Sequence, residues 1–369
     1  MRLRRLLGGL LAAALGLALG PGAVASGQGY LRLEGHGGPI KGLAVSSDGG
    51  LALSASFDNA LGLWSLPDGR HLGWLEGHAA AANAAIFLPG GRALSAGDDF
   101  ALILWDLDSR TALHRLEGHR GKIIALALSP DGTMAASAGW DGRIGLWSLD
   151  DPTAPPRWLE GHQANVNDVA FAEGGRILYS AGYDGTLRRW DLEDTSHTPY
   201  ATVVGHGFGL NHIVLDEAAG WIAYGALDGA VRVRDIATGD TLADLTAERK
   251  PILALDHDPG AGLLAVGDGE GYIMVVETAS WTIARDFRAA LRGPIWALAW
   301  EPGTAEAPGR LIAGGIADEA AVWPVMAFAP GEGEPALFAD APRPFHADPA
   351  SMGNGERQFM RKCSICHSL

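Results

Sequence analysis

The sequence predicts an all-β protein assembled from repeated units, and three observations support this prediction. Only 19% of the 369 residues are charged, while 52 Gly and 20 Pro favour short strands joined by tight turns over coiled coils or long helical arrays. Hydrophobic residues make up 47% of the chain, which is enough to build a large core. The pair Gly-His recurs at spacings of 41 to 44 residues. We therefore expect a folded repeat protein.

Each unit carries two marks, one at its start and one near its end. The first is the Gly-His pair, whose histidines are His36, His78, His119, His162 and His206. The second is a Trp, or its replacement, that ends an apolar β-like run at Trp64, Trp105, Trp147, Trp190, Arg234, Val276 and Trp323. Successive second marks lie 41 to 47 residues apart, which makes seven units.

In two units the Trp of the second mark is followed by Asp, at Trp105-Asp106 and Trp190-Asp191. With this period, the chain resembles the WD-repeat β-propeller family, in which each blade has four strands. The resemblance implies a seven-bladed propeller over about residues 29–327. The segment from Tyr30 to Leu33 precedes the first Gly-His, so we expect it to supply the outer strand of the last blade and close the ring.

The resemblance also implies a hydrogen-bonded set of His, Ser, Asp and Trp inside a blade. Ser lies ten residues and Asp six residues before the Trp in the first four units. A buried His and Asp need partners, and a fourfold repeat argues for packing over a hydrolase triad. The fifth unit has drifted, with Tyr224 and Arg234 in place of the Ser and Trp. The four complete sets are His36, Ser54, Asp58, Trp64; His78, Ser95, Asp99, Trp105; His119, Ser137, Asp141, Trp147; and His162, Ser180, Asp184, Trp190.

Two groups of positions are expected to emerge on one face of the propeller, where relatives of this family contact partners. An aromatic patch there is consistent with protein docking, and the alternative is that these side chains cover the mouth of the channel. The residues just before the turn Asp are Phe57, Asp98, Trp140, Tyr183 and Leu227. The residues five after the Gly-His histidine are Lys41, Asn83, Ile124, Asn167 and Asn211.

The N-terminus has the pattern of an export signal. Three Arg precede a 15-residue apolar stretch from Leu6 to Gly20, followed by Pro21 and the small residues Ala23-Val24-Ala25. A membrane anchor is the alternative, but this stretch is short and Gly-rich for a span, and no later segment is long and apolar enough to cross a bilayer. We expect residues 1–25 to be a cleaved signal peptide, which leaves a net charge of about −18 and a periplasmic protein in a Gram-negative source.

A second module is expected after a Pro-rich linker over residues 328–350. The end of the chain contains Cys363, Cys366 and His367, the Cys-x-x-Cys-His signature of covalent haem c attachment. Two thiols three residues apart on a helical turn can bond the two haem vinyl groups, while the adjacent imidazole binds the iron. A redox disulfide lacks a surrounding βαβ pattern, and half a zinc site lacks its other ligands. One haem c per chain is the prediction.

Residues 351–369 resemble the first helix of a class I cytochrome c domain, with Gly355 and Phe359 preceding the motif. That family continues for some tens of residues and offers a Met as second axial ligand, whereas the sequence here ends at Leu369. Met326, Met352 and Met360 all precede the motif and are not convincing ligands. We therefore expect a fragment of a longer gene product, with an incomplete α-helical cytochrome c domain.

Charge and composition reduce the number of function classes that fit the sequence. The net charge of −15 argues against nucleic acid or an anionic membrane as main partner. We favour an electron carrier, not an enzyme, whose propeller docks a redox partner protein. The alternatives are an interaction scaffold with a vestigial haem motif, and an oxidoreductase whose propeller holds a catalytic cofactor. The remaining histidines are scattered without ligand spacing, which disfavours the third class: His71, His114, His197, His212, His257 and His346.

Overall fold

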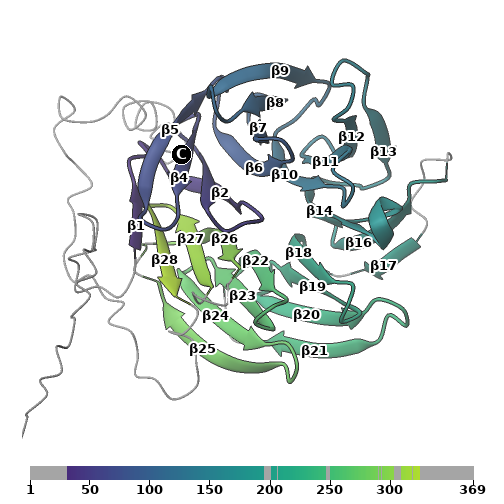
Figure 1. The fold of residues 1–369 in the computed structure, drawn as a ribbon. Coiled ribbons are helices and arrows are strands. Elements are labelled where there is room, and N and C mark those ends of the chain that lie inside the picture. The colour runs from purple at the N-terminus through teal and green to yellow at the C-terminus, as the bar shows by residue number, and fades with distance from the viewer. Residues whose placement is uncertain are drawn as a thin grey trace, which may run out of the picture.

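The chain folds into a ring of seven four-stranded antiparallel sheets (Figure 1). The computed structural model describes residues 31–194, 201–205, 207–246, 250–289, 291, 293–302, 309–317 and 319–324. The only helical element among these residues is a short 3-10 turn, η1 (Glu173–Gly175). The all-β prediction with seven blades is therefore confirmed. The predicted signal peptide, linker and cytochrome segment lie outside the described residues.

The first four blades follow the N-terminal strand β1 (Leu31–Glu34). Blade 1 contains β2 (Ile40–Val45), β3 (Leu51–Ser56), β4 (Ala60–Ser65) and β5 (Arg70–Glu76). Blade 2 contains β6 (Ala82–Leu88), β7 (Arg92–Gly97), β8 (Ala101–Asp106) and β9 (Thr111–Glu117). Blade 3 contains β10 (Ile123–Leu128), β11 (Met134–Gly139), β12 (Arg143–Ser148) and β13 (Arg157–Glu160). Blade 4 contains β14 (Val166–Ala172), β15 (Ile177–Gly182), β16 (Thr186–Asp191) and β17 (Ala201–Gly205).

The last three blades complete the ring. Blade 5 contains β18 (Leu210–Asp216), β19 (Trp221–Ala226), β20 (Ala230–Asp235) and β21 (Thr241–Thr246). Blade 6 contains β22 (Ile252–Asp258), β23 (Leu263–Asp268), β24 (Tyr272–Glu277) and β25 (Thr282–Arg288). Blade 7 contains β26 (Ile295–Glu301), β27 (Arg310–Gly315) and β28 (Glu319–Pro324), and its fourth strand is β1.

Ring closure joins the two ends of the propeller. Strand β1 pairs antiparallel with β28, with Leu31 opposite Val322 and Leu33 opposite Ala320. Apolar side chains of blades 7 and 1 then share one buried cluster that includes Leu33, Trp64 and Ile312. The predicted closure by an upstream segment is confirmed for residues 31–34, because the N-terminal strand completes the C-terminal blade. The predicted limits at residues 29 and 327 lie outside the described residues.

The core lies between neighbouring sheets. One cluster joins Leu94 and Leu102 of blade 2 to Ile123 and Trp147 of blade 3, and each of the other adjacent pairs of blades packs in the same way. Fully burying one such Leu or Ile contributes roughly 1.5–3 kcal/mol relative to leaving it exposed. Stability therefore depends on contacts between blades, and a blade alone could not bury both faces of its sheet.

Every inner strand begins with a β-bulge. The register between the first and second strand of each blade shifts after its first pair, for example between Ile40 and Gly42 in blade 1. A bulge leaves one residue out of the ladder and re-aims its side chain. These bulge residues are Lys41, Asn83, Ile124, Asn167, Asn211, Leu253 and Trp296.

Candidate functional site

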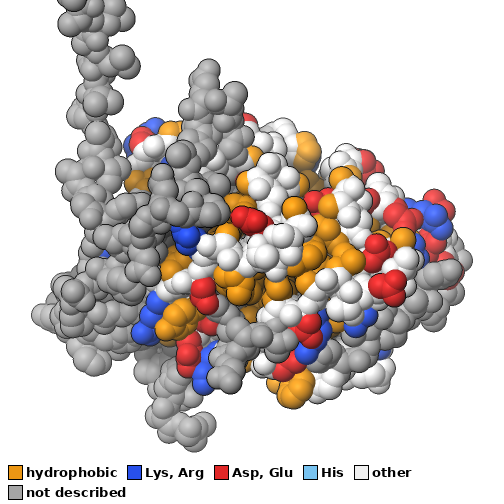
Figure 2. Space-filling view, turned by 90° about the horizontal axis from the view of Figure 1, so that it is seen from below, with side chains coloured by type: hydrophobic (Ala, Val, Ile, Leu, Met, Phe, Trp, Pro, Cys, Tyr) orange, Lys and Arg blue, Asp and Glu red, His pale blue; other side chains and the backbone are white. Residues whose placement is uncertain are grey.

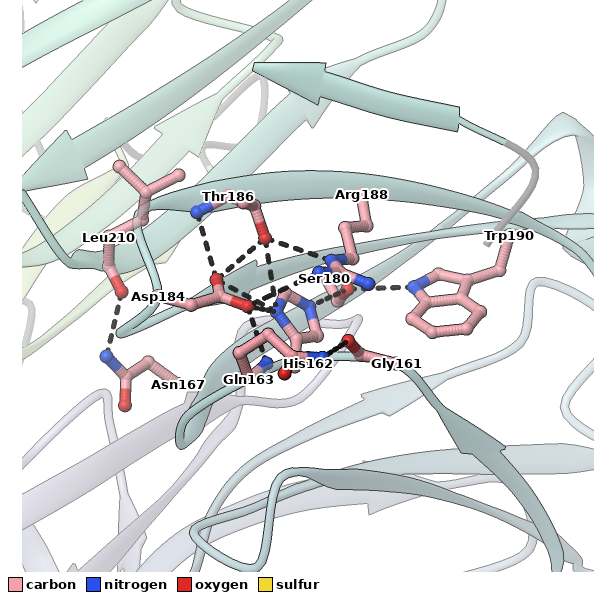
Figure 3. Close-up of polar contacts among 10 residues, drawn as sticks. All are labelled: Gly161, His162, Gln163, Asn167, Ser180, Asp184, Thr186, Arg188, Trp190 and Leu210. Atoms are coloured by element: carbon pink, nitrogen blue, oxygen red, sulfur yellow. Dashed lines mark hydrogen bonds and ion pairs between the residues drawn. The ribbon is translucent and has the colours of Figure 1, made fainter. Parts of the chain in front are cut away.

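The four predicted sets of His, Ser, Asp and Trp are assembled in blades 1 to 4, and Figure 3 shows the one in blade 4. Trp190 Nε1 donates to Ser180 Oγ at 2.8 Å, and Ser180 Oγ lies 2.7 Å from His162 Nε2. His162 Nδ1 lies 3.0 Å from Asp184 Oδ2. Blades 1 to 3 repeat this chain, with Trp–Ser distances of 2.8 Å and Ser–His distances of 2.7 Å.

The partners of each imidazole determine which ring nitrogen donates a hydrogen bond and which one accepts. A carboxylate only accepts, so Nδ1 of the neutral His donates to the Asp, and Nε2 accepts from the Ser hydroxyl. The same Ser oxygen accepts from the Trp N–H. Each polar atom in the chain therefore has a partner, which is what burial of these groups requires.

Backbone N–H groups and neighbouring basic side chains provide further partners for the carboxylates of the four sets. Asp58 accepts from the backbone N–H of Gly37 at 2.8 Å, and Asp141 is also bound by Arg143. Burial alone would raise the pKa of these carboxyls, but the hydrogen bonds outweigh it, and the pKa of Asp58, Asp99 and Asp141 falls below its usual value. The pKa of Asp184 falls to about 2, because hydrogen bonds from Thr186 and Gln163 outweigh burial.

The serines cannot serve as nucleophiles. Ser54, Ser95, Ser137 and Ser180 are fully buried, and each is held between an indole and an imidazole. A substrate carbonyl would need an exposed hydroxyl within reach of its base. The geometry therefore supports the packing role for all four sets.

A glycine next to the sets of blades 3 and 4 was not singled out by the sequence reasoning. A Cβ at Gly182 would lie 2.3 Å from His162 Nδ1, and one at Gly139 would lie 2.4 Å from His119 Nδ1. Only a residue without a side chain leaves room for the His–Asp contact in these two blades. The signal is visible in the sequence as Ser-Ala-Gly at Ser137 to Gly139 and Ser180 to Gly182.

Blades 5 and 6 replace the polar chain by other contacts. In blade 5, Arg234 Nε donates to the Tyr224 hydroxyl at 3.2 Å, and Arg232 binds Asp228 at 2.9 Å. In blade 6 the Ser and Trp positions are Val266 and Val276, both fully buried in an apolar cluster. His206 and the side chain of Trp323 lie outside the described residues.

One end of the ring, here called the mouth face, is formed by two kinds of connection. They are the loops that lead into inner strands, residues 35–39, 77–81, 118–122 and 161–165 with their equivalents, and the turns at residues 57–59, 98–100, 140–142, 183–185, 227–229 and 269–271. The predicted turn residues lie here, and Trp140 and Tyr183 are 44% and 54% exposed. Phe208 is 55% exposed on the loop before β18, and Gly209 lies against Tyr183 and Leu227. Apolar side chains therefore gather on the mouth face of blades 3 to 5.

The asparagines at bulge positions act differently from the sequence-based expectation. Asn83 and Asn167 are buried, so the expectation that they emerge on the face is wrong. Asn83 Nδ2 donates to the carbonyl of Ile123, and Asn167 Nδ2 donates to that of Leu210. The bulge aims each amide at the first residue of the next inner strand. Asn211 repeats the contact, and these three amides therefore link blades.

Two carboxylates also link neighbouring blades, and sequence reasoning missed both. Asp168 accepts from the backbone N–H of Ile213 at 2.8 Å, and Asp256 accepts from that of Trp300 at 2.6 Å. Burial raises the pKa of Asp168, and it raises the pKa of Asp256 to about 7. Both side chains belong to inner strands. The hydrogen-bond partner of each lies more than 40 residues further along the chain.

A second apolar surface lies on the outer rim of blades 5 and 6. Seen from below the view of Figure 1, hydrophobic side chains gather in the middle of the described surface with charged residues of both signs around them (Figure 2). Leu242 on β21 and Ile283 on β25 are large apolar residues exposed there.

The described residues contain no group of three or more His, Cys, Asp or Glu side chains arranged to hold a metal ion. Within the same residues, no helix has the length and apolar character needed to span a bilayer. The predicted haem residues Cys363, Cys366 and His367 lie outside the described residues. The propeller and the haem motif are thus separate parts of the chain, and only the propeller has a described geometry.

Comparison with known protein families identifies WD40 repeats. The family described as WD domain, G-beta repeat, matches residues 27–65, 110–148 and 154–191. These stretches end at or just after Trp64, Trp147 and Trp190, the final members of three of the polar sets. No curated protein matches the chain. The chain is therefore a seven-bladed propeller in which three stretches match the WD40 repeat.

Proposed function

We propose that this protein is an exported c-type cytochrome, in which covalent haem transfers electrons and the propeller docks the redox partner. The observation that carries the proposal is the motif Cys363, Cys366 and His367, which takes up both cysteines of the chain. A random occurrence of this motif in a protein with only two cysteines is improbable. Electron transfer then requires a docking surface, which a WD40 propeller provides.

The chemistry of the donor set fits haem c. Cys363 and Cys366 would hold the porphyrin through thioether bonds, and the His367 imidazole would bind the iron. Bound haem supplies one-electron redox chemistry. The chain's own contribution is to tether the group beside a docking module, because the propeller itself offers buried serines and no arranged metal ligands among its described residues.

The N-terminal pattern supports export. Arg2, Arg4 and Arg5 precede the apolar stretch, and small residues end it at Ala25. Haem attachment to this motif takes place outside the cytoplasm, so the motif requires the export that the N-terminal pattern predicts. We infer a periplasmic location for the mature chain.

Haem content after export tests the proposal. The full chain is expressed in a bacterium competent for cytochrome maturation, and the periplasmic fraction is analysed by pyridine haemochrome spectroscopy. We expect one covalent haem per chain, and none in the double variant Cys363→Ser and Cys366→Ser. His119→Ala is the matched control, since it disturbs a blade and should leave haem content unchanged.

An interaction scaffold with a vestigial motif is the second candidate, and the WD40 repeats favour it. A colourless protein that is exported and folded would support the scaffold and contradict the haem proposal. A protein that stays in the cytoplasm with both thiols free would contradict the proposed export as well.

A further inference from the structure

The seam between blades 5 and 6, the line on the outer rim where these two sheets meet, leaves part of its apolar core exposed. Ala243 and Leu245 of β21 and Trp281 before β25 pack against the cluster that the two blades share, yet all three are only partly buried. Trp281 contacts Trp221 of blade 5, with 5.3 Å between ring centroids. Ile283, two residues further along, is 51% exposed. Apolar side chains gather on this side of the ring (Figure 2).

Two other seams of the ring are covered by an indole. Trp74 of β5 packs at the seam of blades 7 and 1, and Trp158 of β13 packs at the seam of blades 2 and 3. Each lies against the Trp of its own polar set, with 5.9 and 5.8 Å between ring centroids. In blade 6 the same position belongs to Asp286, because Asp286 pairs with Met274 as Trp158 pairs with Gly145. Blade 6 thus places a carboxylate where blades 1 and 3 place the covering ring.

Blades 5 and 6 are also more acidic than the blades on the opposite side of the ring. Residues 207–246 and 250–289 contain 12 Asp and Glu against 5 Lys and Arg, a formal charge of −7. Blades 2 and 3, residues 77–160, contain 10 against 7, a formal charge of −3. Opposite charges attract over about 10 Å in dilute salt. The exposed seam therefore favours a ligand that is both apolar and basic.

The chain leaves the propeller beside this seam. Strand β28 is the third strand of blade 7, and it ends at Pro324, the position that Glu277 holds at the end of β24 in blade 6. The turn after Glu277 leads to Trp281, so Pro324 and Trp281 lie at the same end of the ring, opposite the mouth face. Blades 6 and 7 are neighbours that share one apolar cluster. The chain that follows Pro324 is therefore tethered one blade away from the seam.

The part of that chain that matches the seam in character is the haem segment, residues 351–369. It contains three basic residues and one acidic residue, a formal charge of +2 in a chain whose net charge is −15. Phe359 and Met360 add large apolar side chains between its cations. Residues 325–350, which connect it to the propeller, contain four acidic residues and one Arg. As an extended Pro-rich chain, those residues span roughly 80 Å, which is ample to reach the adjacent blade.

We propose that the seam of blades 5 and 6 binds the chain's own haem segment, residues 351–369, with its apolar side chains against Trp281 and Ile283 and its cations towards the carboxylates of the two blades. The inference rests on the proposed function and places the haem on the side of the ring, away from the mouth face. A second copy of the propeller is disfavoured as the occupant, because it would bring another acidic rim against this one.

Zero-length crosslinking of the purified full-length protein tests the inference. A carbodiimide joins a lysine amine to a carboxylate that it touches, and Lys362 is the only lysine of the haem segment. We expect mass spectrometry to find Lys362 joined mainly to blades 5 and 6, for example to Asp286 or Glu277. Blades 2 and 3 are the internal reference, since they carry almost as many carboxylates. Tethered docking should favour blades 5 and 6 over this reference by about fivefold or more.

One pair of variants separates docking at the seam from attraction to acidic surface in general. We expect Ile283→Ser to reduce the crosslink yield several-fold. Leu113→Ser is the matched control, because Leu113 is 45% exposed on β9 of blade 2, and it should leave the yield unchanged. An equal mixture of ¹⁵N-labelled and unlabelled protein distinguishes links within one chain from links between two copies.

Three results would each overturn the inference. They are equal yields on blades 5 and 6 and on the reference blades, links that join two copies only, and a yield that Ile283→Ser leaves unchanged. Haem content is measured on the same sample. A haem-bearing protein without the seam crosslink keeps the proposed function and loses the docking site. A colourless protein with the crosslink keeps the docking site and loses the proposed function, so the two failures are distinguishable.

Discussion

The first four blades and the last three hold the same four-stranded sheet by different interactions. Blades 1 to 4 each bury a chain of four polar side chains, and blade 6 fills the Ser and Trp positions with Val266 and Val276. Blade 5 uses Arg234 on the Tyr224 hydroxyl instead. Strand order, ladder register and inner-strand bulges are nevertheless the same in both groups.

The comparison teaches which interactions define a blade. Strand pairing and apolar contact between neighbouring sheets are common to all seven, so they determine the fold. The polar chain is an addition that ties the mouth-face loop to the second and third strands. Its loss in blades 5 and 6 is tolerated because Val266 and Val276 introduce no polar atom, and Arg234 is bound by the Tyr224 hydroxyl and the Gly239 carbonyl.

The largest difference in stability between the two groups of blades should come from substitutions at the Trp position. We expect Trp105→Ala to lower the free energy of unfolding by about 3–5 kcal/mol, since it removes a fully buried ring and a hydrogen bond to Ser95. Val276→Ala at the equivalent position of blade 6 should cost less, because fewer buried atoms are lost. Urea denaturation monitored by circular dichroism measures both. Equal losses would mean that the polar chain adds nothing in blade 2.

Steric space beside the imidazole gives the next test. Gly182→Ala places a Cβ on His162 Nδ1, and we expect a loss of about 1–3 kcal/mol from overpacking. Gly207→Ala is the matched control, because a Cβ there meets nothing within 4 Å. Surface changes of that kind fall within about 0.5 kcal/mol of neutral. If Gly182→Ala were as stable as Gly207→Ala in thermal unfolding, the contact between His162 and Asp184 would not be essential.

Removing single polar partners should distinguish the two groups of blades. His119→Ala leaves Ser137 and Asp141 without a partner and should cost about 1–3 kcal/mol. Tyr224→Phe in blade 5 removes one hydroxyl from Arg234 and should cost about 0.5–1.5 kcal/mol. Chemical denaturation provides both values. A larger loss for Tyr224→Phe would reverse the assignment of the stronger network to the first four blades.

Two carboxyls, Asp184 in blade 4 and Asp256 in blade 6, should respond to pH in opposite directions. The pKa of Asp184 is lowered to about 2 in the folded chain, so its contribution is present above the ordinary value of 3.8 and is lost as pH falls towards 2. The pKa of Asp256 is raised to about 7, so its contribution is present below 3.8 and is lost as pH rises towards 7. Asp256→Asn should therefore raise the melting temperature at pH 7 and have little effect at pH 3.5. An unchanged melting temperature at pH 7 would contradict the raised pKa.

The sequence was sufficient for features with a fixed local spacing. The period and the four polar sets follow from positions within one unit, because each of blades 1 to 4 is a single run of four consecutive strands. The ring closure follows from the extra segment that precedes the first Gly-His pair. The Ser-Ala-Gly pattern before Asp141 and Asp184 is also visible in the sequence, because the glycine and the His and Asp that it lies against belong to the same unit.

The mouth face was less predictable. Asn83 and Asn167 were expected on the surface, but the bulge turns each amide towards a carbonyl about 40 residues away. Asp168 and Asp256 were not recognised, because their partners belong to the next blade. Such contacts depend on how closely inner strands approach around the channel, which no spacing within one repeat records.

The central claim is that the chain carries haem on its two thiols beside the propeller. Intact-mass analysis of the purified periplasmic protein, followed by sequencing of the peptide that contains Cys363 and Cys366, tests it most directly. The account predicts a chain beginning at Ser26 with the mass of one haem added, located on that peptide. An unmodified mass with both cysteines free to react with a thiol reagent would contradict it.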